Sequence, residues 1–513
     1  MLSVLPVLLP FLAAVALLFL RHSRTAQAVL SGVAAHAALA LAAHLLARTA
    51  DGTIHVMRMG DWPGTFGIVF ALDQLSALFI ALNAVIHAAT WWFVRCGGMP
   101  ALAQQRYFHP LLLILAAGVN WAFATADLFN LFVSFELILL ASYALMIFDN
   151  EAGQLRAGFR FVAMNVLGGT LFLLGAGLVY GTFGTLNYAD LAIKVAQTEQ
   201  RGVAAALAFW LLFVFGLKAA VFPLFFWLPG AYPKAPIGIL PFFAGMLTKV
   251  GVYCFYRLYT VCFGSLAAEW TQPALLALAA LTMVVGVFGA LGQWSMRGIL
   301  SVHIVSQIGY MVFGLAMFTT AGLAAGLFTT LHNVVVKTTL FLVAGFVVVH
   351  HRGDSVKGIH GLLRSYPWLG IAFLLAAVSL AGLPPLSGFY GKYFAVLEGF
   401  RTGHWFVAGA ALFTSLFTLA SMVKIWTACF WGERDHEPVS AEAARPLLVV
   451  AGGLAAVSVL VAVFSAPLME WCASCAESLL DPRAYVEAVL GAPLPEGVVL
   501  GVPQAAPAEV AAP

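Results

Sequence analysis

The feature that most constrains this chain is the recurrence, along its whole length, of apolar runs long enough to cross a membrane. Such runs are the signature of spanning helices, because about 20 residues of helix cross the hydrocarbon core of a bilayer. Of the 513 residues, 62% are hydrophobic and only 9% are charged. The weakly alternating segments of a membrane β-barrel are not seen. The sequence therefore predicts an all-α polytopic membrane protein.

Hydropathy predicts about fourteen spanning helices. Their expected ranges are 2–20, 26–47, 72–94, 109–126, 127–148, 158–182, 204–229, 236–262, 272–293, 299–319, 322–350, 369–397, 404–431 and 446–467. Glycines and a proline interrupt residues 49–71, so we expect an extended external loop there. Residues 470–490 are predicted to form an interfacial helix, with Cys472 and Cys475 as unpaired packing residues, and the Pro/Ala-rich end to be disordered.

Loop charge predicts the orientation of the chain. The loop between the first two predicted helices, and every second loop after it, together carry about twice as many Lys and Arg residues as the opposite loops. The positive-inside rule then places these loops in the cytoplasm and both termini outside it. The chain has no basic stripe, so nucleic acid is not expected as a partner. No cluster of Cys and His residues has the spacing of a zinc site, and no metal is expected.

Ionisable side chains inside predicted spans are the candidates for function. Each such group costs about 2.5–3.5 kcal/mol at the bilayer centre on insertion scales. The candidates taken from them are one glutamate, Glu136, and five lysines, Lys218, Lys249, Lys337, Lys392 and Lys424. Asp127 lies at a helix edge. A structural ion pair is the alternative role for Glu136, and an interfacial position is the alternative for Lys424.

Two predicted helices, the seventh and the twelfth, are broken by proline. Lys218 precedes Pro223 by five residues, and Lys392 follows Pro384 and Pro385. Proline removes a backbone donor, and in a bilayer the freed groups are tolerated only within protein or along a hydrated cavity. Paired broken helices predict inverted repeats and a transport site near the midplane. We therefore predict four parts: helices 1–3 with the external loop (1–108), one five-helix repeat (helices 4–8, 109–262), a second (helices 9–13, 272–431), and the last helix with its tail (446–513).

These residues form the parts of a proton relay. A lysine removed from water loses affinity for its proton, and a carboxylate nearby restores it. Lys218 paired with Glu136 would hold its proton, and would release it when the pair opens. Further stations would be Lys249, His303, His332, Lys337 and Lys392, with Thr248, Ser306, Gln307 and Thr338 holding water between them. For each histidine, a structural role within the helix bundle is the alternative.

Several segments carry a resemblance to a known family. They are FELILLASYALMIF, MNVLGGTLFLLGAGLVYGTFGTLNYADLA, LKAAVFPLFFWLPGAYPKAP, AGMLTKVGVYCFYRLY, SVHIVSQIGYM, LHNVVVKTTLF and GLPPLSGFYGKY. Their order resembles that of the antiporter-like membrane subunits of respiratory complex I, membrane-bound hydrogenases and Mrp multisubunit Na⁺/H⁺ antiporters, over about residues 60–490. GDWPGTFGIVFALDQLSAL and LLDPRAYVEAVLG are most similar to the D-type subunits of the Mrp antiporters.

The resemblance implies two inverted repeats and a proton path along a central polar axis. The family positions that it carries over are Glu136, Lys218, Lys249, Lys337 with His332 nearby, and Lys392, but not Lys424. It also implies other Mrp subunits as partners in a bacterial inner membrane, Na⁺ and H⁺ as transported ions, and no bound flavin, iron–sulfur cluster or quinone.

Two other functions remain open on these grounds. One is a proton-pumping subunit of a redox complex of the complex I or hydrogenase type. The other is a bundle that only anchors partner subunits, in which the buried charges serve assembly. The spans offer few carboxylates for a hard cation, so the path of Na⁺ is not assigned to this chain.

Overall fold

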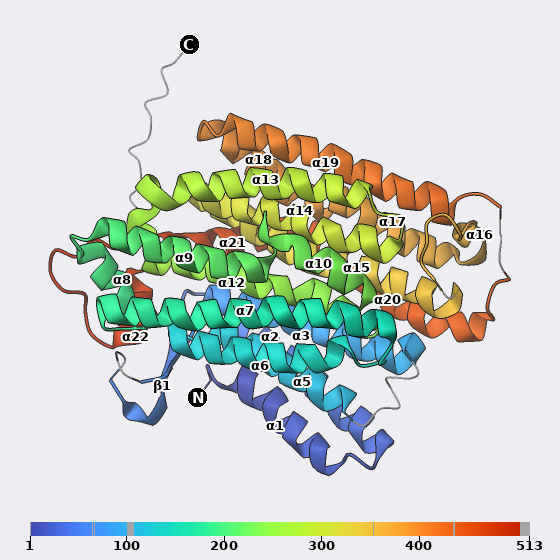
Figure 1. Cartoon of the computed structure of the whole chain (residues 1–513), viewed down its shortest axis with the longest axis horizontal. Coiled ribbons are helices and arrows are strands. Elements are labelled where there is room, and N and C mark those ends of the chain that lie inside the picture. Colours follow the sequence, from blue (N-terminus) through green and yellow to red (C-terminus); the bar gives the residue numbers. More distant parts are fainter. Residues whose placement is uncertain are drawn as a thin grey trace.

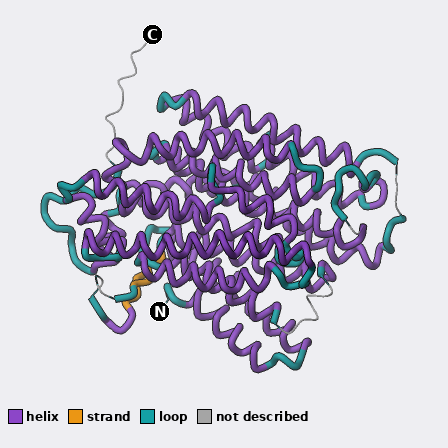
Figure 2. The backbone as a smooth tube through the Cα atoms, in the orientation of Figure 1, coloured by secondary structure: helices purple, strands orange, loops and turns teal. Residues whose placement is uncertain are grey.

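The computed structural model describes residues 2–63, 65, 67–99, 107–351, 353–433 and 437–502. The Pro/Ala-rich end that the sequence predicts to be disordered lies outside these residues. Long helices run side by side and dominate the structure (Figures 1 and 2). The prediction of an all-α polytopic membrane protein is confirmed.

The first part of the chain contributes helices that pack consecutively. They are α1 (Leu5–Phe19), α2 (Arg24–Thr49), α3 (Gln74–Phe93), α5 (Phe108–Ala124), α6 (Leu128–Met146), α7 (Ala152–Phe183), α8 (Tyr188–Gln197), α9 (Arg201–Ala219), α10 (Trp227–Ala231), α11 (Leu240–Phe242) and α12 (Thr248–Arg257). Short π-helical turns, Phe243–Leu247 and Leu258–Cys262, flank α12.

The second part is α13 (Gln272–Leu291), α14 (Met296–Ala316), α15 (Thr320–His351), α16 (Leu362–Ser365), α17 (Pro367–Ala381), α18 (Ser387–Arg401), α19 (Trp405–Ile425), α20 (Ala441–Val463), α21 (Ser465–Leu480) and α22 (Arg483–Leu490). Every predicted span coincides with helical structure. Among the described residues, ten helices or runs of helices are long and apolar enough to cross a membrane, and three shorter ones are apolar. Nearly every side chain of α14 is buried, so this helix lies at the centre of the bundle.

The predicted external loop is in part a β-hairpin. Strands β1 (His55–Arg58) and β2 (Val69–Leu72) pair antiparallel, with His55 opposite Leu72. β-branched residues such as Val56 and Val69, on either side of a Gly/Pro-rich turn, favour these strands. The prediction of an extended loop did not take them into account. Arg58 donates hydrogen bonds to the carbonyls of Ala488 and Val489, which fasten the hairpin to α22.

The predicted C-terminal interfacial helix is two helices. Pro482 separates α21 from α22, because proline cannot continue the hydrogen bonding of a helix interior. Cys472, Cys475 and Leu479 on α21 are buried, and α21 packs against α15. The two cysteine thiols are not linked to one another. The segment is therefore bound to the bundle by one apolar face.

Candidate functional site

Both proline-containing helices are interrupted beside their lysines. After α9 ends at Ala219, Ala220 adopts a left-handed conformation with φ 61°, and α10 begins only at Trp227. After α17 ends at Ala381, Gly382 adopts φ 88°, and α18 begins at Ser387. Each interruption leaves carbonyl groups without their helical donors.

Lys392 uses the carbonyl groups that the second interruption exposes. Its ammonium donates to the carbonyls of Leu380 at 2.8 Å and Ala381 at 3.2 Å, the last residues of α17. A cation at a helix C-terminus also interacts favourably with the helix dipole. A cavity of about 330 Å³ beside Lys392 is lined by Tyr310 and Ser415 among others. The lysine is therefore held by the broken helix and has open space next to it.

A chain of hydroxyl groups joins α15 to both halves of the same break. His332 Nδ1 lies 2.9 Å from Ser387 Oγ, which lies 3.1 Å from Ser379 Oγ. A side chain at position 388 would collide with the carbonyl oxygen of Ser379 and with the His332 ring, so Gly388 is needed for this approach. The histidine is thus linked directly to the segment that carries Lys392.

Lys249 and Lys337 are fully buried on neighbouring central helices. The Lys249 ammonium donates to the carbonyl of Ala244 in the π-helical turn before α12, and Lys337 donates to the carbonyl of Leu300 on α14, both at 3.0 Å. Lys337 interacts electrostatically with both Lys249 and Lys392, and His303 interacts with Lys337 and Lys392. The structure therefore brings these groups together from α12, α14, α15 and α18.

Polar atoms without a protein partner lie on these helices. Within the described part of the chain, five buried side-chain atoms here have no hydrogen-bond partner: Thr248 Oγ1, Ser301 Oγ, His303 Nε2, His332 Nε2 and Asn333 Oδ1. Buried polar atoms in proteins nearly always have a partner, and ordered water supplies it where protein does not. The region around these five atoms therefore offers several hydrogen-bonding positions to water.

Glu136 and Lys218 lie near each other, but the pair is open. Lys218 is 8% exposed and interacts electrostatically with Glu136, yet among the described residues no ion pair within 4.0 Å and no hydrogen bond joins them. The Lys218 ammonium instead lies 5.6 Å from the centre of the Phe135 ring. Glu136 is half-buried and points toward Gly169 of α7, where there is no side chain to exclude it.

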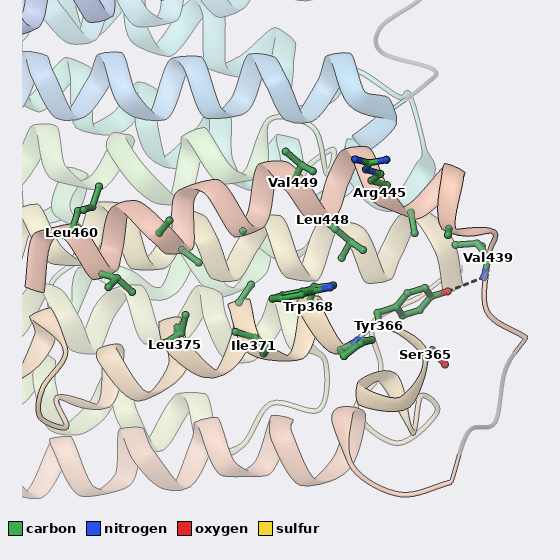
Figure 3. Close-up of a pocket in the computed structure, with 18 residues that line it drawn as sticks. Ser365, Tyr366, Trp368, Ile371, Leu375, Val439, Arg445, Leu448, Val449 and Leu460 are labelled. Atoms are coloured by element: carbon green, nitrogen blue, oxygen red, sulfur yellow. Dashed lines mark hydrogen bonds between the residues drawn. The ribbon is translucent and has the colours of Figure 1, made fainter.

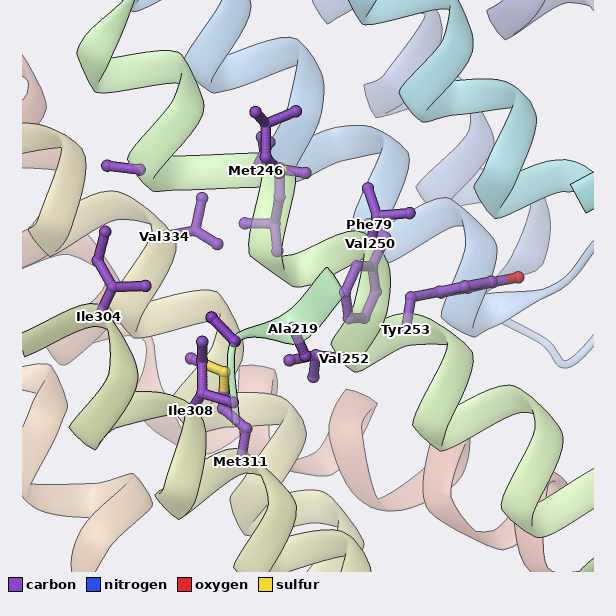
Figure 4. Close-up of a cluster of buried hydrophobic side chains, with 14 of the residues drawn as sticks. Phe79, Ala219, Met246, Val250, Val252, Tyr253, Ile304, Ile308, Met311 and Val334 are labelled. Atoms are coloured by element: carbon purple, nitrogen blue, oxygen red, sulfur yellow. The ribbon is translucent and has the colours of Figure 1, made fainter. Parts of the chain in front are cut away.

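Apolar packing surrounds the end of α9, next to Lys218 in the sequence. Figure 4 shows Ala219 beside Val252, with Met246, Ile308 and Met311 close by. A side chain at Gly251 would collide with the backbone of Ala219, so α9 and α12 are in direct contact there. The helices that carry Lys218 and Lys249 therefore touch at this point.

The remaining predicted residues occupy helix ends. Asp127 accepts a hydrogen bond from the Asn130 N–H at 2.7 Å and caps α6. Lys424 donates to the carbonyls of Leu291 and Gln293 at the end of α13, with its ammonium 3.8 Å from the centre of the Trp294 ring. These contacts hold Asp127 and Lys424 at helix ends, and a role of either residue in proton transfer stays a prediction.

One buried ion pair was missed by the sequence prediction. Arg257 is 1% exposed and binds Asp73 through two hydrogen bonds of 2.7 Å. Arg257 falls inside the predicted span 236–262, and Asp73 falls at the start of 72–94. Two opposite charges inside predicted spans are the signal that could have found this pair.

Comparison with known proteins places the chain among membrane subunits. The family model described as NADH:quinone oxidoreductase/Mrp antiporter, TM, matches residues 125–418. The chain is 38% identical to the D subunit of the Na⁺/H⁺ antiporter of Alkalihalophilus pseudofirmus, over 95% of this chain and 99% of that protein. It is 34% identical to the protein of the same name from Bacillus subtilis, with the same coverage.

Solved structures agree with this assignment. A chain of the Mrp complex from Dietzia superimposes with a TM-score of 0.89 and 31% identity, covering 95% of this chain and 99% of that chain. A chain of respiratory complex I from Thermus thermophilus superimposes with a TM-score of 0.80 and 25% identity, over 94% and 99% of the two chains. The chain therefore belongs to the NADH:quinone oxidoreductase/Mrp antiporter family of membrane proteins.

Proposed function

We propose that this chain is the proton-translocating subunit of a multisubunit Na⁺/H⁺ antiporter of the Mrp type. In this role it is a secondary ion transporter and not an enzyme, and it exchanges inward protons for outward Na⁺ together with its partner subunits. Two relatives that share 95% of its length are named as D subunits of Na⁺/H⁺ antiporters, and a structural relative comes from an Mrp complex.

The observation that carries the proposal is the cluster of buried lysines and histidines on α12, α14, α15 and α18. Each of Lys249, Lys337 and Lys392 donates to a backbone carbonyl, and unpartnered polar atoms lie among them. Groups of this kind inside a membrane protein mark ion and proton pathways. Their order supports proton transfer from Lys249 through Lys337 to Lys392, with His303 and His332 as intermediate groups.

Glu136 and Lys218 form the switch of the proposed mechanism. When the pair closes, the carboxylate holds the proton on Lys218; when it opens, as in this structure, the proton is driven toward Lys249. Motion of a partner subunit or arrival of the cation would open the pair. If cation binding changes the proton affinity of Lys218, protonation of Lys218 must change the cation affinity by the same factor.

The proposal includes a bacterial inner membrane, with both termini outside the cytoplasm. The N-terminal segment is fixed by a hydrogen bond from Asn120 to the Pro6 carbonyl, and residues near it contact β2. The hairpin is in turn fastened to α22, so both ends of the described chain lie on one side. A cavity of about 520 Å³, lined by Asp149, Gln154 and Lys234 among others, is the proposed cytoplasmic inlet.

The two inverted repeats, 109–262 and 272–431, remain part of the proposal. Their support is the matched interruption of α9 and of the α17–α18 pair, each with a lysine beside it. In both cases the turn after the helix has a residue in the left-handed conformation, Ala220 or Gly382.

Antiport in membrane vesicles tests the switch. Glu136→Ala and Lys218→Ala complexes should assemble at the wild-type level and lose Na⁺-driven proton movement. Lys194→Ala is the matched control, because Lys194 is partly exposed on α8 and pairs only with Asp190 of the same helix. Exchange at the wild-type rate in both switch variants would exclude the mechanism. Failure of both to assemble would favour the purely anchoring role.

The alternative is a proton-pumping subunit of a redox complex. The structural similarity to a chain of respiratory complex I supports this alternative. Purification of the complex from its native membrane separates the two. Small partner subunits without redox centres support the antiporter, whereas partners that carry iron–sulfur clusters support the alternative.

A further inference from the structure

A large groove lies outside the proton path, between α17 and α20. It has a volume of about 960 Å³ and is lined almost entirely by apolar side chains (Figure 3). Small residues form its floor: a side chain added at Gly452 would meet no atom within 4 Å. Large apolar side chains border it and remain exposed, including Val449 at 63% and Leu460 at 52%.

One end of the groove is polar, and the polar groups gather at the loop side of the bundle. Figure 3 shows Arg445 on α20, and Tyr366 and Ser365 near α16, at this end, with Leu460 and Leu375 at the other. The N–H of Val439 donates a 2.9 Å hydrogen bond to the Tyr366 hydroxyl, which braces the rim. The groove thus has a polar head and an apolar body.

Two groups at the polar end of the groove, Arg445 and Ser365, have no protein partner among the described residues. In the part of the chain that the structure describes, Arg445 is exposed and makes no ion pair within 4.0 Å, although Glu442 lies one turn before it. The Ser365 hydroxyl oxygen is buried without a hydrogen-bond partner among the same residues. Trp368, which is 71% exposed, is a residue typical of the membrane–water interface. A negatively charged group matches this end.

The dimensions match one leaflet of a bilayer. From Arg445 to Leu460, α20 extends about 22 Å at 1.5 Å per residue. One leaflet contributes about 15 Å to a hydrocarbon core of about 30 Å. The groove is therefore long enough to hold an acyl chain of one leaflet whose headgroup lies at Arg445.

We propose that this groove binds an anionic phospholipid of the surrounding bilayer, with the phosphate at Arg445 and an acyl chain along Gly452. Arginine near the membrane surface attracts anionic headgroups. The bound chain would also support α17, whose last carbonyls hold Lys392. The inference is independent of the Na⁺/H⁺ exchange proposed above.

The test uses the assembled complex in nanodiscs of phosphatidylcholine and phosphatidylglycerol, with a phosphatidylglycerol that carries a photoreactive group in its acyl chain. Labelled peptides from α17 and α20 are expected in the wild type. Gly452→Leu should lower this labelling because its side chain narrows the groove where the acyl chain is proposed to lie. Arg445→Gln should lower the preference for phosphatidylglycerol over phosphatidylcholine about fivefold, the factor for ~1 kcal/mol per basic residue.

Each of the two substitutions, Gly452→Leu and Arg445→Gln, has a matched control. Gly453 has equal open space but does not line the groove, and Arg364 is an exposed basic residue that does not line it either. Gly453→Leu and Arg364→Gln should label like the wild type. Unchanged labelling in Gly452→Leu, or equal labelling by both lipids in the wild type, would overturn the proposal. Photocrosslinking from position 368 to a partner subunit instead of lipid would also overturn it.

Discussion

Arg257 and Asp73 form a two-point ion pair, in which the two terminal nitrogens of the guanidinium each lie 2.7 Å from a different carboxylate oxygen. The Tyr485 ring stacks on the guanidinium, with its centre 4.7 Å from the central carbon. The pair therefore joins the start of α3, the end of α12 and the C-terminal helix α22. It stabilises the side of the bundle to which the hairpin is fastened.

Removal of Arg257 alone should be strongly destabilising. Arg257→Met leaves the largely buried Asp73 carboxylate without its partner, and breaking a buried pair in this way costs about 3–5 kcal/mol. Thermal unfolding of the solubilised complex should show a lower midpoint. Asp73→Asn combined with Arg257→Met should restore part of the loss. The pair Arg483–Asp481, 60% and 62% exposed, is the control, and Arg483→Met should leave the midpoint nearly unchanged.

Lys392→Met should abolish most proton transfer while the complex still assembles. Loss of a positioned proton-transfer group costs about 10²-fold or more in rate. Na⁺-driven proton movement in vesicles measures this loss of rate. Lys424→Met should retain most of the activity, since the Lys424 ammonium of α19 binds carbonyls at the end of α13. Equal losses of exchange in Lys392→Met and Lys424→Met would mean that Lys392 is no more important for proton transfer than Lys424.

Gly388→Ala should impair transport through the geometry of the broken helix. A side chain at this position would collide with the Ser379 carbonyl oxygen and separate His332 from Ser387. Gly409→Ala on α19 is the matched control, because a side chain there meets nothing within 4 Å. The expected outcome is a normal exchange rate in the control and at least about a tenfold loss, or ~1.4 kcal/mol, in Gly388→Ala. Wild-type exchange by Gly388→Ala would show that the hydroxyl chain is dispensable.

Asp149, in the loop after α6, should make stability depend on pH. Burial raises the pKa of its carboxyl, Glu151 raises it further, and the hydrogen bond from Gln154 opposes the change. The folded state then binds the proton more tightly than the unfolded state, so stability falls as pH rises from about 3.9 through the raised pKa. Asp149→Asn should unfold at a higher temperature than the wild type at pH 7. The difference should disappear in acid; a difference independent of pH would contradict the assignment.

The sequence predicted the spans and the buried lysines because both depend on the local cost of placing a group in lipid. It also located the interruptions near Lys218 and Lys392, since proline acts on its own helix. The hairpin at 55–72 was missed because four-residue strands leave little hydropathy signal. The Asp73–Arg257 pair, the open Glu136–Lys218 pair and the apolar packing around Ala219 depend on contacts between distant helices. The two charges of the Asp73–Arg257 pair can be seen in the sequence, but no local pattern shows which residues of distant helices meet.

The half-buried position of Glu136 on α6 has a consequence for the turnover of unassembled copies in the cell. A copy without its neighbours would present an acidic group near the hydrocarbon at a cost of about 2.5–3.5 kcal/mol, and we expect a partner subunit to cover this group in the assembled complex. We expect surplus copies to be less durable than assembled ones and to be degraded first by membrane proteases. The same carboxylate that serves transport would then help to keep subunit numbers matched.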